Sequence, residues 1–213
     1  MRAKQPGTDA RQTILATGRR IIGGKGFAAV GLNEILLAAG VPKGSFYHYF
    51  SSKEAFGEAL LESYFTAYLH DLGALLSRTD MSVAERLMVY WRKWLDLQLA
   101  DDPEGRCLAV KLGAEVADLS EPMRLTLERG TVTVIDHLAE AIAAGVEDRS
   151  IMPGDPPRQM AASLYQMWLG ASLLAKISRS SGPLDAALAE TARRLGTRVD
   201  PPTSRPRAAE TAI

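Results

Sequence analysis

The chain has 213 residues, of which 46% are hydrophobic, and its 25 Lys and Arg residues balance 25 Asp and Glu residues. This length and composition predict a soluble globular protein with room for one small unit and a larger core. No apolar run approaches the roughly 20 residues that span a bilayer, and the amino terminus has no hydrophobic signal core, so we expect a cytoplasmic protein without membrane contact.

Three helices are predicted within the first fifty residues. The first covers Thr8 to Lys25 and the second Leu32 to Ala39. Gly40 can adopt the left-handed conformation that a sharp helix exit needs, and Pro42 suits the first turn of a third helix, Lys43 to Phe50. An apolar helix, a glycine turn and a short second helix in this order are typical of a helix-turn-helix.

The third predicted helix has two chemically different sides. Phe46, Tyr49 and Phe50 follow the i, i+3, i+4 spacing of one helical face. The residues that point away from that face are Lys43, Ser45, Tyr47 and His48. This exposed side favours contact with DNA, although a helical hairpin inside a bundle would use the same corner.

Charge is divided unevenly along the chain. Residues 1–53 hold eight Lys and Arg against two Asp and Glu, which leaves 17 basic and 23 acidic residues in the remainder. A head of net charge +6 on a body of −6 suits a protein whose one end docks on phosphate. Accidental asymmetry of a solvated surface is the alternative explanation.

Helices are also predicted through most of the remaining chain. Ser52 caps a long fourth helix, and later starts are marked by Ser82 and by Ser120 with Pro122. The predicted ranges are Lys53 to Ser77, Ser82 to Leu99, about Glu104 to Leu119, Ser120 to about Gly145, Arg158 to Ser180, and Pro183 to Leu195. With no credible strand, we expect an all-α fold of about nine helices.

The predicted organisation is a three-helix helix-turn-helix DNA-binding domain at 1–52 and a larger helical ligand and dimerisation domain at 53–196. Residues 197–213 contain several prolines and predict a disordered tail. The run MAASLYQMWLGASLLAKI, residues 160–177, is apolar on most of its circumference, so one face can pack on its own core and another on a partner's helix. We expect a homodimer; a fully buried core helix in a monomer is the alternative.

The motif VPKGSFYHYFSSKEAF, residues 41–56, resembles the signature of TetR/AcrR-type transcriptional repressors. The likeness covers the head from about Thr8 to Leu61. Two later stretches, CLAVKLGAEVADLSEPMR (107–124) and WLGASLLAKISRS (168–180), resemble the electrophile-responsive NemR subfamily. The resemblance implies a dimeric protein that reads palindromic double-stranded operator DNA in the major groove.

The motif match also implies individual DNA-binding roles. Gly44 and Ser45 leave room for close approach of a phosphate, and Tyr49 and Lys53 are expected to hold phosphate. The residues expected to face the groove are Lys43, Ser45, Tyr47 and His48, and an arm with Arg2 and Lys4 is expected to track the backbone or minor groove. Gly31 stands where the family often has a capping Ser or Thr, so that capping hydroxyl is absent.

Cys107 is the only cysteine, which excludes a disulfide within the chain. Cys107 follows Gly105 and Arg106 near a predicted helix start. This position is expected to lower the pKa of its thiol below the value of about 8.5 for a free cysteine, and so to favour the thiolate. A lone intracellular cysteine is more often a small buried hydrophobe. The resemblance implies the sensor role, because the sensing cysteine of that subfamily occupies this place in the motif.

Lys176 is the one lysine in an otherwise apolar stretch. We expect it near Cys107, where an ammonium would favour the thiolate or a neutral amine would trap an oxidised sulfur; a lysine that reaches the surface at an interface is the equal alternative. Trp91 and Trp168 are weaker candidates for lining an effector pocket, because residues at this spacing more often belong to the core. No cofactor or metal site is expected, because His70 and His137 have no ligand partners at helical spacing.

Three functions are consistent with these features. The first is a repressor that releases its operator when an electrophile or oxidant modifies Cys107. The second is the same architecture gated by a non-covalent hydrophobic effector. The third, an enzyme with Cys107 as nucleophile, is disfavoured because no His-Asp pair accompanies the thiol in the motif.

Overall fold

The computed structural model describes residues 6–100 and 107–197, and the regular elements in these ranges are all α-helices. The helices are α1 (Pro6–Lys25), α2 (Leu32–Ala39), α3 (Lys43–Tyr49), α4 (Lys53–Leu76), α5 (Val83–Leu99), α6 (Leu108–Leu119), α7 (Glu121–Glu147), α8 (Pro157–Ser178) and α9 (Gly182–Leu195). The expected all-α class is confirmed. The predictions for Arg2, Lys4, Gly105, Arg106 and the tail beyond residue 197 lie outside the described residues.

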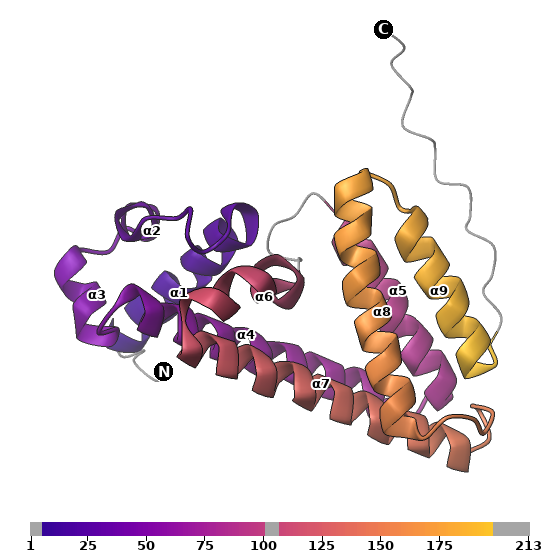
Figure 1. The fold of residues 1–213 in the computed structure, drawn as a ribbon. Coiled ribbons are helices and arrows are strands. Elements are labelled where there is room, and N and C mark those ends of the chain that lie inside the picture. The colour runs from indigo at the N-terminus through magenta and orange to yellow at the C-terminus, as the bar shows by residue number, and fades with distance from the viewer. Residues whose placement is uncertain (1–5, 101–106, 198–213) are drawn as a thin grey trace, which may run out of the picture.

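The first three helices lie together as a head (Figure 1), and their buried side chains share an apolar core. Ile14 and Ile22 of α1, Ile35 of α2 and Phe46 of α3 are fully buried. Phe56, in the second turn of α4, lies with its ring centroid 5.8 Å from that of Phe46. Because α4 closes the head core and then continues into the body, the two parts are mechanically connected.

The body is built on two long helices, α4 and α7, that lie side by side (Figure 1). Gly130 of α7 permits this close approach, since a Cβ atom there would lie 2.3 Å from the ring of Phe65 in α4. Helices α5, α8 and α9 pack around the far end of this pair, and α6 packs on α7 and α8. None of the described helices is long and apolar enough to cross a membrane.

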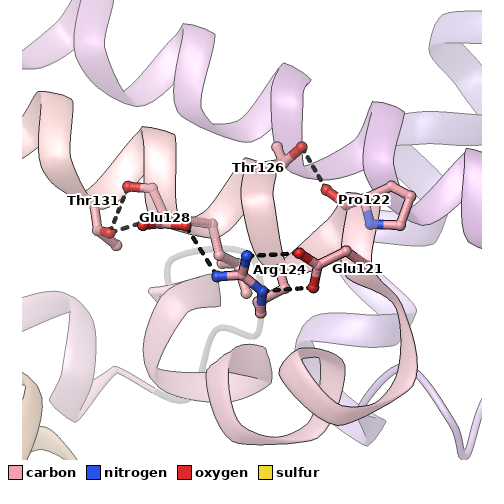
Figure 2. A network of polar contacts seen from close by, with 7 residues as sticks. Glu121, Pro122, Arg124, Thr126, Glu128 and Thr131 are labelled. Carbon is pink, nitrogen blue, oxygen red and sulfur yellow. Dashed lines mark hydrogen bonds and ion pairs between the residues drawn. The ribbon is translucent and has the colours of Figure 1, made fainter.

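The start of α7 carries a polar network on its exposed side (Figure 2). Ser120 caps the helix, accepting from the amide of Met123, and Arg124 makes ion pairs with Glu121 at 2.7 Å and Glu128 at 2.9 Å. Exposed ion pairs at helical spacing stabilise a helix only weakly, because water and salt screen the charges. The network therefore supports the helix without forming a site.

Candidate DNA-binding head and sensor pocket

Helix α3 presents the two sides expected from its sequence. Phe46 is fully buried and Phe50, just after the helix, is 3% exposed, whereas Tyr47 is 53% exposed. Lys43, Gly44 and His48 are also exposed, and Ser45 is half-buried. The exposed side thus offers a cation, a close backbone approach and two aromatic polar groups, which is a combination suited to a DNA groove.

The turn before α3 has the expected geometry. Gly40 adopts φ 65° and ψ 28°, and its amide donates back to the carbonyls at the end of α2. Gly31 precedes α2 in extended conformation without a side-chain capping bond, as its lack of a hydroxyl requires. The glycine at position 40 is needed because residues with a Cβ rarely adopt positive φ.

Tyr49 and Lys53 are less exposed than the side chains of the α3 surface. Tyr49 is half-buried. The ammonium of Lys53 donates to the backbone carbonyl of Phe27 at 2.8 Å, and it lies 4.5 Å from the centre of the Phe27 ring. Lys53 therefore helps to hold the turn between α1 and α2. A phosphate would accept hydrogen bonds from its other N–H groups.

Cys107 lies directly before α6, as the residue that caps the helix, and is 8% exposed. The sequence predicted a thiol of lowered pKa near the start of a helix. That prediction is wrong: burial raises the pKa of the Cys107 thiol, and the backbone amides of Val110 and Ala109 offset this only in part. Desolvation of the thiolate outweighs the helix terminus.

Tyrosines surround the thiol. The hydroxyl of Tyr64 in α4 donates to Cys107 Sγ at 3.6 Å, and the hydroxyls of Tyr68 and Tyr90 are 2.5 Å apart. Burial raises the pKa of all three phenols, so they stay protonated. The ring of Tyr64 also lies 5.3 Å from the guanidinium carbon of Arg19 in α1.

Two cavities meet at Cys107. The first, of about 250 Å³, lies between α4 and α5 and has an aromatic and apolar wall that includes Tyr64, Tyr68 and Trp94. The second, of about 340 Å³, lies between α6 and α8 and is bordered by both Cys107 and Lys176. The thiol is thus buried yet adjacent to space on two sides, which gives a small reagent room to reach it.

The raised thiol pKa predicts a distinct pH dependence of alkylation. The thiolate is the nucleophile, so its fraction, and the alkylation rate with it, rises with pH until the pKa is passed. We expect the rate of Cys107 alkylation by iodoacetamide to go on rising at pH values where the rate for a free thiol, with its pKa near about 8.5, has already levelled off. A plateau below pH 8 would contradict the raised pKa.

The sequence placed Lys176 near Cys107, and the structure brings the two residues to the wall of one cavity. Lys176 is exposed, and it belongs to the last turn of α8. The same wall carries Lys111 of α6 and Arg179 after α8, so this cavity is rich in cations.

Trp91 and Trp168 do not line the candidate effector pocket. They stack with ring centroids 5.0 Å apart and are 1% and 0% exposed, so that prediction is wrong: the pair forms the centre of the body core. Their neighbour Trp94 lines the cavity instead. Apolar spacing alone does not show which side of α5 meets a cavity and which meets α8.

Truncation of the stacked pair should be severe. Trp168→Ala removes a fully buried ring and the bond from its indole N–H to Thr191 at 2.9 Å. We expect a loss of about 3 to 5 kcal/mol in unfolding free energy, the range for large-to-small core changes. Urea titration followed by circular dichroism measures this; a loss below about 1 kcal/mol would place the pair outside the core.

The sequence analysis missed the residues that connect Cys107 to its surroundings. Tyr64 and Tyr68 stand four residues apart on α4 and therefore share one face of the helix. Because a buried tyrosine hydroxyl requires a hydrogen-bond partner, this spacing could have indicated a polar group near that face. Lys111 and Glu115 stand four residues apart on α6 and both contact the head. Nothing in their sequence distinguishes this pair from an ordinary exposed i, i+4 ion pair.

One face of α8 has no partner in the described chain. Leu173, Leu174 and Ile177 are 52%, 55% and 70% exposed. Gly170 adds to this face, since a Cβ there would meet nothing within 4 Å. By contrast, Ala161 and Ala171 of α8 are buried within the protomer, as are Leu184 and Leu195 of α9.

Comparison with known families matches both parts of the chain. Residues 14–60 match the family of bacterial regulatory proteins, tetR family, and residues 83–191 match the tetracyclin repressor-like C-terminal domain.

Individual relatives cover nearly the whole chain. The HTH-type transcriptional repressor NemR of Escherichia coli (strain K12) is 44% identical over 89% of this chain and 95% of its own. The HTH-type transcriptional repressor DhaR of Mycobacterium sp. (strain GP1) is 32% identical over 85% of this chain and 89% of its own. The crystal structure of the reduced form of E. coli NemR superposes with a TM-score of 0.84, covering 90% of this chain and all of that one.

Proposed function

The chain belongs to the tetR family of bacterial regulatory proteins and is a DNA-binding transcriptional repressor related to NemR, and from this premise we propose that it is a dimer that releases its operator when an electrophile or oxidant modifies Cys107. Regulators of this family are not enzymes, so the thiol serves as a sensor instead of a nucleophile in turnover. The partners are palindromic double-stranded DNA, a second copy of the chain and a reactive small molecule.

The observation that carries the proposal is the position of Cys107. The thiol lies between two cavities, directly before α6 and in contact with Tyr64 of α4. An adduct on a side chain that is 8% exposed has to displace at least one neighbour, because protein interiors have little spare volume. The two neighbours are the start of α6 and Tyr64 of α4, and both of these helices contact the head.

The mechanism is a shift between two populations. In the unmodified protein the heads of a dimer are held at a separation that fits two half-sites of the operator. An adduct at Cys107 favours a different arrangement of α4 and α6, in which the heads no longer fit both half-sites. Loss of one half-site weakens binding by several kcal/mol on the scale of specific over non-specific affinity.

The test compares wild-type protein with Cys107→Ser. Operator affinity is measured by fluorescence anisotropy before and after one equivalent of N-ethylmaleimide per chain. We expect wild-type affinity to fall on the order of a hundredfold, while Cys107→Ser binds equally with and without reagent. A Cys107→Ser protein that is still released by the reagent would contradict the proposal.

Lys176 has a second role in this proposal. Because it shares a cavity wall with Cys107, we assign it to the oxidant response, through its charge or through its amine. Lys176→Met should bind the operator normally when reduced but respond more weakly to hypochlorite. An unchanged response would remove Lys176 from the mechanism.

A non-covalent hydrophobic effector is the second candidate. The cavity between α4 and α5 favours it, because its wall is largely apolar and the hydroxyls of Tyr68 and Tyr90 offer a place for one polar group. An effector of this kind would release Cys107→Ser as readily as wild type. The two candidates are therefore separated by the same variant.

The head assignment is part of the proposal as well. We assign base contacts to Lys43, Ser45, Tyr47 and His48, close backbone approach to Gly44, and phosphate contacts to Tyr49 and Lys53. The domain boundary proposed between residues 52 and 53 coincides with the capping of α4 by Ser52, whose side chain accepts from the amide of Ala55. The exposed side of α3 supports this assignment.

A further inference from the structure

Helix α6 reaches the head through two side chains on one face. Lys111 donates to the carbonyl of Gly24 at 3.0 Å. One turn further along, Glu115 accepts from the amide of Phe27 at 3.1 Å and from the amide of Ala28 at 2.5 Å. These three bonds join α6 to the end of α1 and to the turn that follows it, and Figure 1 shows α6 between the head and α8.

The turn offers these backbone groups because α1 has just ended. The last carbonyls of a helix and the amides of the following turn have no partners within the helix. Gly26 adopts φ 97°, and a Cβ there would lie 3.0 Å from Glu115 Oε2. The carboxylate therefore fits closely over the turn, and both of its oxygens are used.

Movement of this turn also moves the exposed side of α3. Phe27 and Val30 are buried in the core of the head together with Ile22 of α1. Lys53 at the start of α4 also holds this turn through the Phe27 carbonyl. A displacement of residues 24–28 is consequently transmitted to α2 and α3 as one packed unit.

We infer that Glu115, supported by Lys111, is the positioning residue through which modification of Cys107 reorients the head. Cys107, Lys111 and Glu115 are spaced by four along one helix, and the carbonyl of Cys107 accepts from the amide of Lys111 at 3.1 Å. When an adduct displaces the start of α6, the helix carries Glu115 with it, and the two amides follow the carboxylate. The inference rests on the proposed function of Cys107.

The test measures operator affinity for Glu115→Gln, reduced and after alkylation with N-ethylmaleimide. Glutamine keeps the length of the side chain but has only one acceptor oxygen and sets an N–H₂ group against a backbone N–H. Asp118→Asn is the matched control, because Asp118 is an exposed acid on the same helix. The quantity of interest is the ratio of alkylated to reduced dissociation constants.

We expect a ratio on the order of 100 for wild type and Asp118→Asn, and a ratio of about 3 or less for Glu115→Gln. A merely structural role would weaken reduced and alkylated protein equally and leave the ratio unchanged. If Glu115→Gln keeps the wild-type ratio, the inference is overturned while the proposed function stands. If wild type itself shows no change on alkylation, the proposed function fails and the inference fails with it.

Hydrogen exchange gives a second readout without DNA. In reduced wild type the Phe27 and Ala28 amides are bonded to the carboxylate, and we expect NMR to show them exchanging faster in Glu115→Gln. Alkylation of wild-type Cys107 should leave both amides protected, because the amides move together with the carboxylate that holds them. Exchange at these amides that accelerates on alkylation would overturn the inference, since the bonds would then break instead of moving the head.

Discussion

Ile177→Glu is expected to abolish dimerisation and, with it, specific operator binding. Ile177 is 70% exposed on the apolar face that includes Leu173, Leu174 and Gly170. Against a symmetry mate, each protomer would place a carboxylate in an apolar interface, where an unpaired charge costs several kcal/mol. A monomer reads only one half-site, so operator affinity should fall on the order of a thousandfold.

Analytical ultracentrifugation and fluorescence anisotropy on the operator measure the two effects. Met152→Glu is the matched control, because Met152 is 72% exposed but lies in the turn between α7 and α8, outside this face. The control should stay dimeric and bind normally. Ile177→Glu protein that remains a dimer would show that another face makes the interface.

Tyr47→Ala is expected to weaken operator binding strongly without changing stability. The side chain is 53% exposed on α3, with its ring centroid 5.4 Å from that of Phe46. Loss of a base-edge contact costs about 1 to 3 kcal/mol per half-site. A symmetric dimer loses it twice, so we expect affinity to fall by at least about 30-fold.

Tyr47→Phe serves as the control that keeps the ring. It should fall between wild type and Tyr47→Ala if the hydroxyl makes a polar contact, and match wild type if the ring alone contacts thymine methyl groups. Thermal unfolding should be unchanged in both variants. Equal operator affinity of Tyr47→Ala and wild type would remove Tyr47 from the groove.

The head could be predicted almost entirely from sequence, because its signals are local. Gly40 in the left-handed conformation, the cap at Ser52 and the buried Phe46 each follow from the chemistry of one or two residues. Helix ends agreed closely for the same reason. The division of α3 into a buried side and an exposed side follows directly from helical periodicity.

The sensor region was harder to predict because its properties depend on tertiary packing. The sequence around Cys107 indicates a helix terminus, but it does not indicate that tertiary packing buries the thiol or that this burial raises its pKa. Likewise, the helical pattern of Trp91 and Trp168 fits a pocket wall and a core equally well. Only the packing of α5 on α8 decides between them.

The proposed route from sensor to head could not be predicted from the sequence. Helix α4 is the long helix that directly follows the head, so it is the connection that the sequence indicates. Helix α4 does contact Cys107 through Tyr64, yet α6 holds the head directly through Glu115. Bonds between a side chain and backbone groups 87 and 88 residues away leave no local pattern in the sequence.

The central claim is that modification of Cys107 releases the operator, and one titration tests it most directly. Operator-bound wild-type protein is treated with increasing N-ethylmaleimide, and each sample is divided between intact-mass measurement and anisotropy. We predict that the fraction of chains with a single adduct and the fraction of DNA released rise together. Complete alkylation of Cys107 with the operator still bound at its original affinity would contradict the account.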